Sequence, residues 1–116
     1  MKAVFFIDSY ERWAITLESM EAMLKYSREF GRTHTIEVVS ISISVMGLVR
    51  NVAVLAGWYE RMLALSEAGV VFSVCRDSLM KFNSEGALLC EFANVVVSGV
   101  VEAVRRQSEG FAYIKA

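Results

Sequence analysis

The chain has few of the residue types from which specialised sites are built. Its 116 residues include one histidine, two cysteines and no proline, and 12 Lys and Arg nearly balance 13 Asp and Glu, for a net charge of −1. Phosphate binding needs a clustered cationic surface, so no nucleic acid partner is expected. No C-x-x-C or H-x-x-H spacing suggests zinc, and no metal or other cofactor is expected. The lack of proline by itself points to no structure.

Long hydrophobic runs are also missing. The uncharged stretches 38–49 and 51–59 are 12 and 9 residues long and none in the chain is longer than 12, whereas a membrane-spanning helix needs about 20. No membrane association is expected. The first residues run directly into a strand-like sequence without a signal-peptide cleavage site. A cytoplasmic, reducing location is therefore predicted, in which Cys75 and Cys90 are thiols rather than a disulfide.

Hydrophobic residues, by contrast, are abundant. They make up 55 % of the chain, and the share stays above the roughly 45–50 % of an average domain when glycine is counted in place of tyrosine. Disorder is thereby excluded. The length fits about one domain, predicted to span residues 1–116. Because so short a chain cannot hide this much apolar surface in one core, self-association is predicted.

Short β-branched and aromatic runs alternate with longer segments of helical period, which is typical of a parallel sheet covered by helices. The predicted fold class is therefore α/β. The expected strands are 4–7, 36–43, 70–75, 94–97 and 111–114. The first expected helix begins at a cap at Asp8 or Ser9 and ends at Gly31, with Trp13, Leu17, Met20 and Leu24 facing inward. Residues 46–54 and 58–68 are expected to form one broken helix or two consecutive helices. A further helix is expected to open at Asp77 and Ser78, to be interrupted near 83–86 and to resume through 88–92, and the last is expected over 99–109.

Three polar features are predicted to lie at the surface. The serines of 40–44 alternate with isoleucines, so their hydroxyls share one face of the second strand, which is expected to be less buried. Glu102 and Arg105–Arg106 are predicted to form a solvated helix face. His34, in the turn before the second strand, is expected to be a surface residue at the opposite end of the sheet from Cys75, so no Cys-His dyad is expected.

The most promising chemistry lies at Cys75, the last residue of the predicted third strand. Reactive groups gather at the carboxyl ends of parallel strands, where the next helices begin. Backbone N–H groups at the helix start of Asp77 and Ser78, together with the Arg76 guanidinium, favour thiolate, while the Asp77 carboxylate opposes it. The Cys75 pKa is therefore expected below the free-cysteine value of about 8.5. The alternative is that Cys75 merely packs as a small buried side chain.

Cys90 is predicted to be structural. Its expected surroundings in the helical segment 88–92 are apolar, which hides a thiol and raises its pKa. Other reactive patterns are missing: the chain has no G-x-x-x-x-G-K-[ST] phosphate loop, no G-x-G-x-x-G dinucleotide turn and no G-x-S-x-G elbow. A nucleotide or phosphate binder is therefore ranked low.

Several segments resemble those of DsrE-like proteins, and the resemblance covers essentially the whole chain. Its most specific parts are the Gly-Val stretch leading to Cys75 and the carboxyl-terminal R-Q-x-E-G-[FY]-A-Y-I stretch. It implies a three-layer α/β/α fold of flavodoxin-like architecture with a mainly parallel five-stranded sheet, assembled into homotrimers or homohexamers. The matching segments are Lys2–Asp8 with Trp13, Ile36–Val39, Ala68–Val70 leading to Cys75, Ser78–Leu79, Ser98–Glu102 and Arg106–Ile114.

The resemblance also implies a function. Relatives act in sulfur oxidation and in sulfur relay for transfer-RNA thiolation, where a cysteine in the corresponding loop carries sulfane sulfur as a persulfide. Carried onto this sequence, that cysteine is Cys75, with Arg76, Asp77 and Ser78 as its thiolate environment. The hypothesis is a sulfur carrier, more than a turnover enzyme, acting between donor and acceptor proteins. It needs a protruding, ionised thiol.

The segment after the second strand departs from the pattern of these relatives. Where many relatives have a short polar turn containing glycine after the second strand, this chain has the serine-rich segment 40–47. The pocket wall opposite Cys75 is therefore expected to differ, and a small ligand shared with relatives does not follow. The alternative function is a non-catalytic small-molecule-binding or assembly module of the same fold, in which Cys75 is structural.

Overall fold

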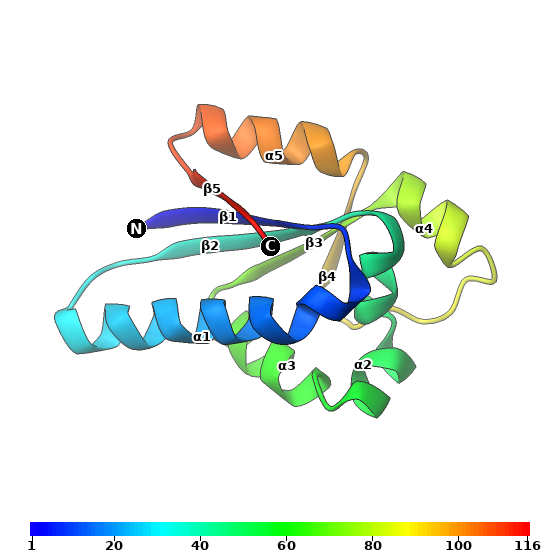
Figure 1. Cartoon of the computed structure of the whole chain (residues 1–116), viewed down its shortest axis with the longest axis horizontal. Coiled ribbons are helices and arrows are strands. Elements are labelled where there is room, and N and C mark those ends of the chain that lie inside the picture. The colour runs from blue at the N-terminus through cyan, green and yellow to red at the C-terminus, as the bar shows by residue number, and fades with distance from the viewer.

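A five-stranded sheet forms the middle layer of the structure, a computed structural model that describes all 116 residues (Figure 1). Every strand pairs in parallel with its neighbour, in the order β4-β3-β2-β1-β5. Helices cover both faces, so the predicted three-layer α/β fold is confirmed. The strands are β1 (Lys2–Ile7), β2 (Thr35–Ser40), β3 (Val71–Cys75), β4 (Ala93–Val96) and β5 (Ala112–Lys115).

The helices are distributed unequally over the two faces. Three of them pack below the sheet in the view of Figure 1, one lies alone above it, and one lies beyond the carboxyl end of β3. None is long and apolar enough to cross a membrane. The helices below the sheet are α1 (Trp13–Phe30), α2 (Arg50–Ala56) and α3 (Tyr59–Glu67). The helix above it is α5 (Gly99–Ser108), and the helix at the end of β3 is α4 (Arg76–Phe82). Two short 3-10 helices are η1 (Tyr10–Arg12) and η2 (Ser42–Leu48).

The main core lies between the sheet and α1, and Trp13 anchors it. The predicted inward stripe of α1 is fully buried. The Trp13 indole N–H donates to the carbonyl of Ser44 over 2.8 Å, and its ring stacks on Phe72 of β3. A side chain at Gly47 would begin 2.2 Å from the indole nitrogen. Glycine there lets η2 approach the ring closely, which fixes the loop that follows β2.

The prediction for the serines after β2 is wrong. The strand ends at Ser40, and the chain turns into η2 instead of continuing as a strand to residue 43. Ser40 and Ser44 are fully buried, and their hydroxyls lie 2.6 Å apart. Ser44 also donates to the carbonyl of Ile7. These hydroxyls close the core over the carboxyl ends of β1 and β2, so they do not form a less buried strand face.

The helix expected to resume through 88–92 is absent. The chain after α4 runs as an irregular segment that crosses the start of α2. The Cys90 N–H donates to the carbonyl of Leu48, and the Arg50 N–H to that of Leu88, each over 2.8 Å. Because these backbone groups bond to a distant segment, they are not available for helical bonds. At the amino end of α1, Asp8 binds Lys115 and does not cap the helix.

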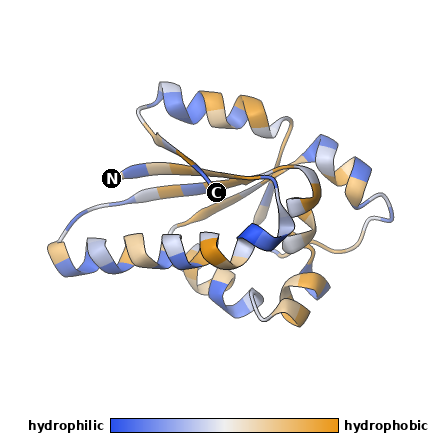
Figure 2. Cartoon of the chain, in the orientation of Figure 1, coloured by the Kyte–Doolittle hydropathy of each residue, from blue (hydrophilic) through white to orange (hydrophobic).

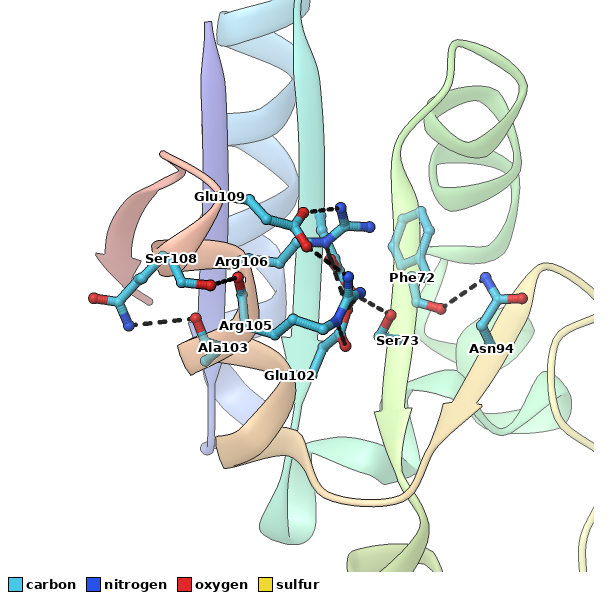
Figure 3. A network of polar contacts seen from close by, with 11 residues as sticks. Phe72, Ser73, Asn94, Glu102, Ala103, Arg105, Arg106, Ser108 and Glu109 are labelled. Atoms are coloured by element: carbon cyan, nitrogen blue, oxygen red, sulfur yellow. Dashed lines mark hydrogen bonds and ion pairs between the residues drawn. The ribbon is translucent and has the colours of Figure 1, made fainter.

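The predicted solvated face of α5 is also corrected, because α5 turns polar side chains toward the sheet. Glu102 is 9 % exposed, and Arg106 reaches Glu37, a carboxylate of β2 that is 1 % exposed. The Arg106 Nε lies 2.5 Å from Glu37 Oε1, and the Ser73 hydroxyl donates to Glu37 Oε2 over 2.5 Å. Figure 3 shows Glu102, Arg105 and Arg106 reaching from α5 toward Ser73 on β3.

The pKa values of Glu37 and Glu102, the two carboxyl groups of this cluster, are shifted in opposite directions. Burial and the neighbouring Glu102 raise the pKa of Glu37. Burial also disfavours the charge on Glu102, but the hydrogen bonds with Glu37 and Arg105 outweigh it and lower the pKa of Glu102. Arg106 lies within reach of both carboxyl groups. It therefore supplies the positive charge without which Glu37 would be a buried, unpaired carboxylate.

Removing that positive charge is expected to destabilise the protein strongly. Arg106→Ala leaves Glu37 buried without its cation, at a cost of about 3–5 kcal/mol. The matched control is Lys25→Ala, which breaks the exposed Lys25–Glu29 pair and should cost about 1 kcal/mol or less. Urea unfolding followed by circular dichroism measures both values. Similar losses in the two variants would contradict a structural role for the Arg106–Glu37 pair.

Candidate functional site

Three chain segments converge on Cys75. It is the last residue of β3, as predicted, and immediately precedes α4. Gly99, the first residue of α5, lies against it: a side chain at Gly99 would begin 3.4 Å from Cys75 Cβ and 2.2 Å from Ile41 Cγ2. Ile41 belongs to the turn that follows β2. The residues that follow β2 and β4 thus pack together beside the end of β3, and only glycine at position 99 leaves room for the contact.

The surroundings of Cys75 favour the thiolate. Burial alone raises the pKa of the thiol, but hydrogen bonds from the Ser78 hydroxyl and from the backbone N–H groups of Ser78, Gly99 and Asp77 outweigh it. The pKa of Cys75 is therefore lower than that of an ordinary cysteine, as the sequence predicted. The donors come from the first turns of two helices, α4 and α5.

The Ser78 hydroxyl is oriented by a second residue. The backbone N–H of Ser42 donates to Ser78 Oγ over 2.8 Å, which leaves the proton of Ser78 free to point at Cys75. Ser42 has a φ of 57°, and no other residue except glycine has a positive φ. Such backbone strain concentrates at functional sites. Ser42 and Ser78 together form a relay of donors that ends at the sulfur.

Two sequence expectations about this site need changing. The main groups that lower the Cys75 pKa are Ser78 and three backbone amides, while the exposed Arg76 lines a groove of about 500 Å³ along the other side of α4. Only 7 % of Cys75 is exposed, so the thiol is recessed and does not protrude. Gly99 was missed by the sequence reasoning, although a Ser-Gly pair directly after a strand, where a helix begins, is a usable signal.

The other candidate residues lie away from Cys75. Cys90 is 2 % exposed in the core below the sheet, and burial, reinforced by Glu91, raises its pKa to about 11. Both cysteines are free thiols. His34 lies before β2, with its Nε2 3.2 Å from the carbonyl of Ala68, at the opposite end of the sheet as expected. Nowhere do three potential metal-ligating side chains come together.

Comparison with known proteins agrees with this geometry. The sequence profile of the DsrE/DsrF-like family matches residues 1–116. The chain belongs to this family. It is similar to the solved structure of MTH1491, a protein of unknown function from Methanobacterium thermoautotrophicum, with 31 % sequence identity and a TM-score of 0.83. The match covers 98 % of this chain and 97 % of that one. No curated protein matches. The DsrE-like resemblance seen in the sequence is thereby confirmed.

The donor relay of this DsrE-like protein predicts a shift in thiol reactivity. In a Cys90→Ser background, Ser78→Ala should move the pH profile of Cys75 alkylation to higher pH, because the thiolate loses its hydroxyl donor. Loss of a charged hydrogen bond worth about 1.5 kcal/mol corresponds to roughly tenfold slower alkylation at neutral pH. Ser78→Thr, which keeps a hydroxyl, should restore the rate. The exposed Ser84→Ala is the control, and an unchanged profile in Ser78→Ala would remove Ser78 from the site.

Proposed function

We propose that this protein carries sulfane sulfur as a persulfide on Cys75. The observation that supports the proposal is the lowered pKa of a buried thiol, since four hydrogen-bond donors overcome the cost of burying its charge. A cysteine that served only for packing needs no such donors, and the pKa of Cys90 is raised by burial, reinforced by Glu91. Membership of the DsrE/DsrF-like family is consistent with a role in sulfur relay.

The proposed transfer needs no oxidant. The Cys75 thiolate attacks the outer sulfur of a donor persulfide, R–S–SH; the donor's S–S bond breaks, R–S⁻ leaves, and Cys75–S–SH forms. In the second step, a nucleophile of the acceptor attacks the outer sulfur and the Cys75 thiolate is the leaving group. The donors of Ser78 and Gly99 stabilise the same negative charge before the first step and after the second. The protein thus acts as a carrier between a donor and an acceptor.

A second function rests on a specific observation, the recessed position of Cys75. With 7 % of its surface exposed, the residue also fits a non-catalytic binding or assembly module in which the cysteine packs between α4 and α5. The two functions differ in what they require of the native fold. A carrier must let a small reagent reach the sulfur without unfolding, and a packed residue need not.

Sulfur loading tests the first function. After incubation with a small persulfide donor, intact-mass spectrometry of the native protein should show added increments of one sulfur atom. The increments should persist in Cys90→Ser and vanish in Cys75→Ser, because only Cys75 has a stabilised thiolate. Loss in Cys90→Ser with retention in Cys75→Ser would assign the sulfur to the other thiol.

Alkylation separates the two functions. At neutral pH, iodoacetamide should label Cys75 of the native protein faster than Cys90, whose pKa of about 11 leaves almost no thiolate. Peptide mapping after a short pulse measures both sites. Urea should expose Cys90 and equalise the two rates. If Cys75 instead labels only in urea, as Cys90 does, it is a packed residue and the module function stands.

A further inference from the structure

The stretch Arg106–Phe111, part of the motif that this sequence shares with DsrE-like proteins, ties α5 to the sheet. The Arg106 guanidinium contacts Glu37 of β2 and Glu109. Its Cζ also lies 4.9 Å from the ring centroid of Phe111. Gly110, with a φ of 90°, lets the chain turn back from α5 into β5. Figure 2 shows hydrophilic residues concentrated at this end of α5. One side chain, that of Arg106, is thus held over the sheet by three neighbours.

Helix α5 has little apolar contact with the sheet that could set its position. Its inward residues are small or charged, and the buried apolar cluster on this face has three members, against 18 in the main core on the opposite face. Apolar contacts are non-directional, whereas a hydrogen bond between charged groups has a narrow range of length and angle. The contact of Arg106 with Glu37 is therefore the one that specifies most sharply where α5 lies. The inward residues are Gly99, Glu102, Ala103 and Arg106.

Two contacts join α5 to the same row of side chains. Glu37 and Val39 point to one side of β2, because side chains alternate along a strand, and Ile41 follows them in that row. A side chain at Gly99 would begin 3.2 Å from Val39 Cγ1 and 2.2 Å from Ile41 Cγ2. Arg106 meets Glu37 further back along the strand. The helix between Gly99 and Arg106 spans about 10 Å, and the strand between the two contacts also spans about 10 Å. Both contacts therefore form together in only one position of α5.

That position brings an unpartnered N–H to Cys75. The first N–H groups of a helix have no acceptor within it, and the N–H of Gly99 is one of the donors that lower the pKa of the Cys75 thiol. The two residues lie side by side, since a side chain at Gly99 would begin 3.4 Å from Cys75 Cβ. A hydrogen bond weakens steeply as its angle departs from linearity. Even a small shift of α5 along β2 would therefore weaken this donor.

We propose that Glu37 and Arg106 are positioning residues for Cys75: their contact sets where α5 lies along β2 and thereby holds the N–H of Gly99 at the sulfur. Neither side chain is among the groups that hydrogen-bond with the thiolate, so both act through the helix. The inference deepens the proposed function and rests on the role that it gives to the Cys75 thiolate. It links the carboxyl-terminal end of α5 to chemistry at the opposite end of the same helix.

Two double variants that leave the net charge unchanged test the positioning. Glu37→Met with Arg106→Met, the methionine pair, removes the contact without leaving a buried charge unpaired. Glu37→Gln with Arg106→Gln, the glutamine pair, removes the same charges but places an amide nitrogen where the arginine Nε was, so a hydrogen bond between β2 and α5 can form again. In a Cys90→Ser background, the methionine pair should slow alkylation of Cys75 at neutral pH about tenfold. The glutamine pair should keep most of the wild-type rate.

Amide NMR follows the Gly99 donor directly. In the wild-type chain, the amide proton resonance of Gly99 should shift as Cys75 ionises, and this shift should be lost in the methionine pair and kept in the glutamine pair. The control is Arg105→Met, which removes the neighbouring positive charge of α5. Because Arg105 binds Glu102 and Glu109 and has no contact with β2, both the alkylation rate and the resonance should stay unchanged. Circular dichroism checks that each variant is folded.

If the methionine pair fails to fold, Arg106→Lys takes its place. Lysine keeps the charge, but its nitrogen lies one bond beyond the position of the arginine Nε, so α5 shifts and Cys75 alkylation should slow by a smaller factor. A folded methionine pair, or in its place Arg106→Lys, with the wild-type rate and Gly99 resonance overturns the inference. So do methionine and glutamine pairs that slow alkylation equally. These measurements follow the thiolate and not sulfur transfer, so a wild-type chain that takes up no sulfur contradicts the carrier function alone.

Discussion

The structure depends on one buried ion pair, Glu37 with Arg106. A carboxylate on the second strand of a parallel sheet lies where both faces are normally apolar, and it is tolerated only with a cation and further donors. Arg106 and Ser73 provide them. Because the cation comes from α5, the ion pair fixes how that helix is rotated over the sheet. The single helix on this face packs on the ion pair and on a small cluster of three buried apolar side chains, whereas the opposite face has the large apolar core.

That rotation determines both the surroundings of Cys75 and the outer surface of α5. It points the N–H of Gly99, at the start of α5, toward Cys75, and it turns the side chains of Val100, Val101 and Val104 to the outside. The Cys75 donors from α4 and the Ser42 turn belong to separate strand ends, so the site exists only when three parallel strands are in register. A thiolate environment and an apolar outer surface thus follow from the same placement of one helix.

Some of these features can be predicted from the sequence, and others cannot, for physical reasons. The alternation of strand and helix patterns predicts all five strands and places Cys75 at a strand end, because hydrophobic period reports local geometry. The orientation of Glu102 and Arg106 is different: two stripes of equal spacing run along α5, and the apolar one is the natural choice for the core. The polar stripe faces the sheet instead because Arg106 pairs with the buried Glu37. Nothing in the sequence of α5 itself shows that Arg106 has this partner on β2.

Backbone conformation explains the remaining failures. The positive φ of Ser42 and the break after Ser40 arise where η2 packs over Trp13, which is a tertiary contact. Likewise, Cys90 directly follows an isolated antiparallel bridge between Val49 and Leu89, and Leu48 accepts its N–H. These segments have sequences compatible with a strand or a helix, and contacts far along the chain override that local preference. The site residues that were missed, Ser42 and Gly99, both lie where such contacts decide the conformation.

The recessed position of Cys75 is compatible with carrying sulfur. Gly99 lies against Cβ of Cys75, and hydrogen bonds from Ser78, Gly99 and Asp77 surround its thiolate, so the outer sulfur of the proposed persulfide would extend toward the small part of Cys75 that is exposed. The inner sulfur then stays shielded by the donors that stabilise it as a leaving group, while the outer sulfur is the one an acceptor meets. In the proposed carrier, the recess around Cys75 would therefore shield the inner sulfur and leave the outer sulfur to the acceptor.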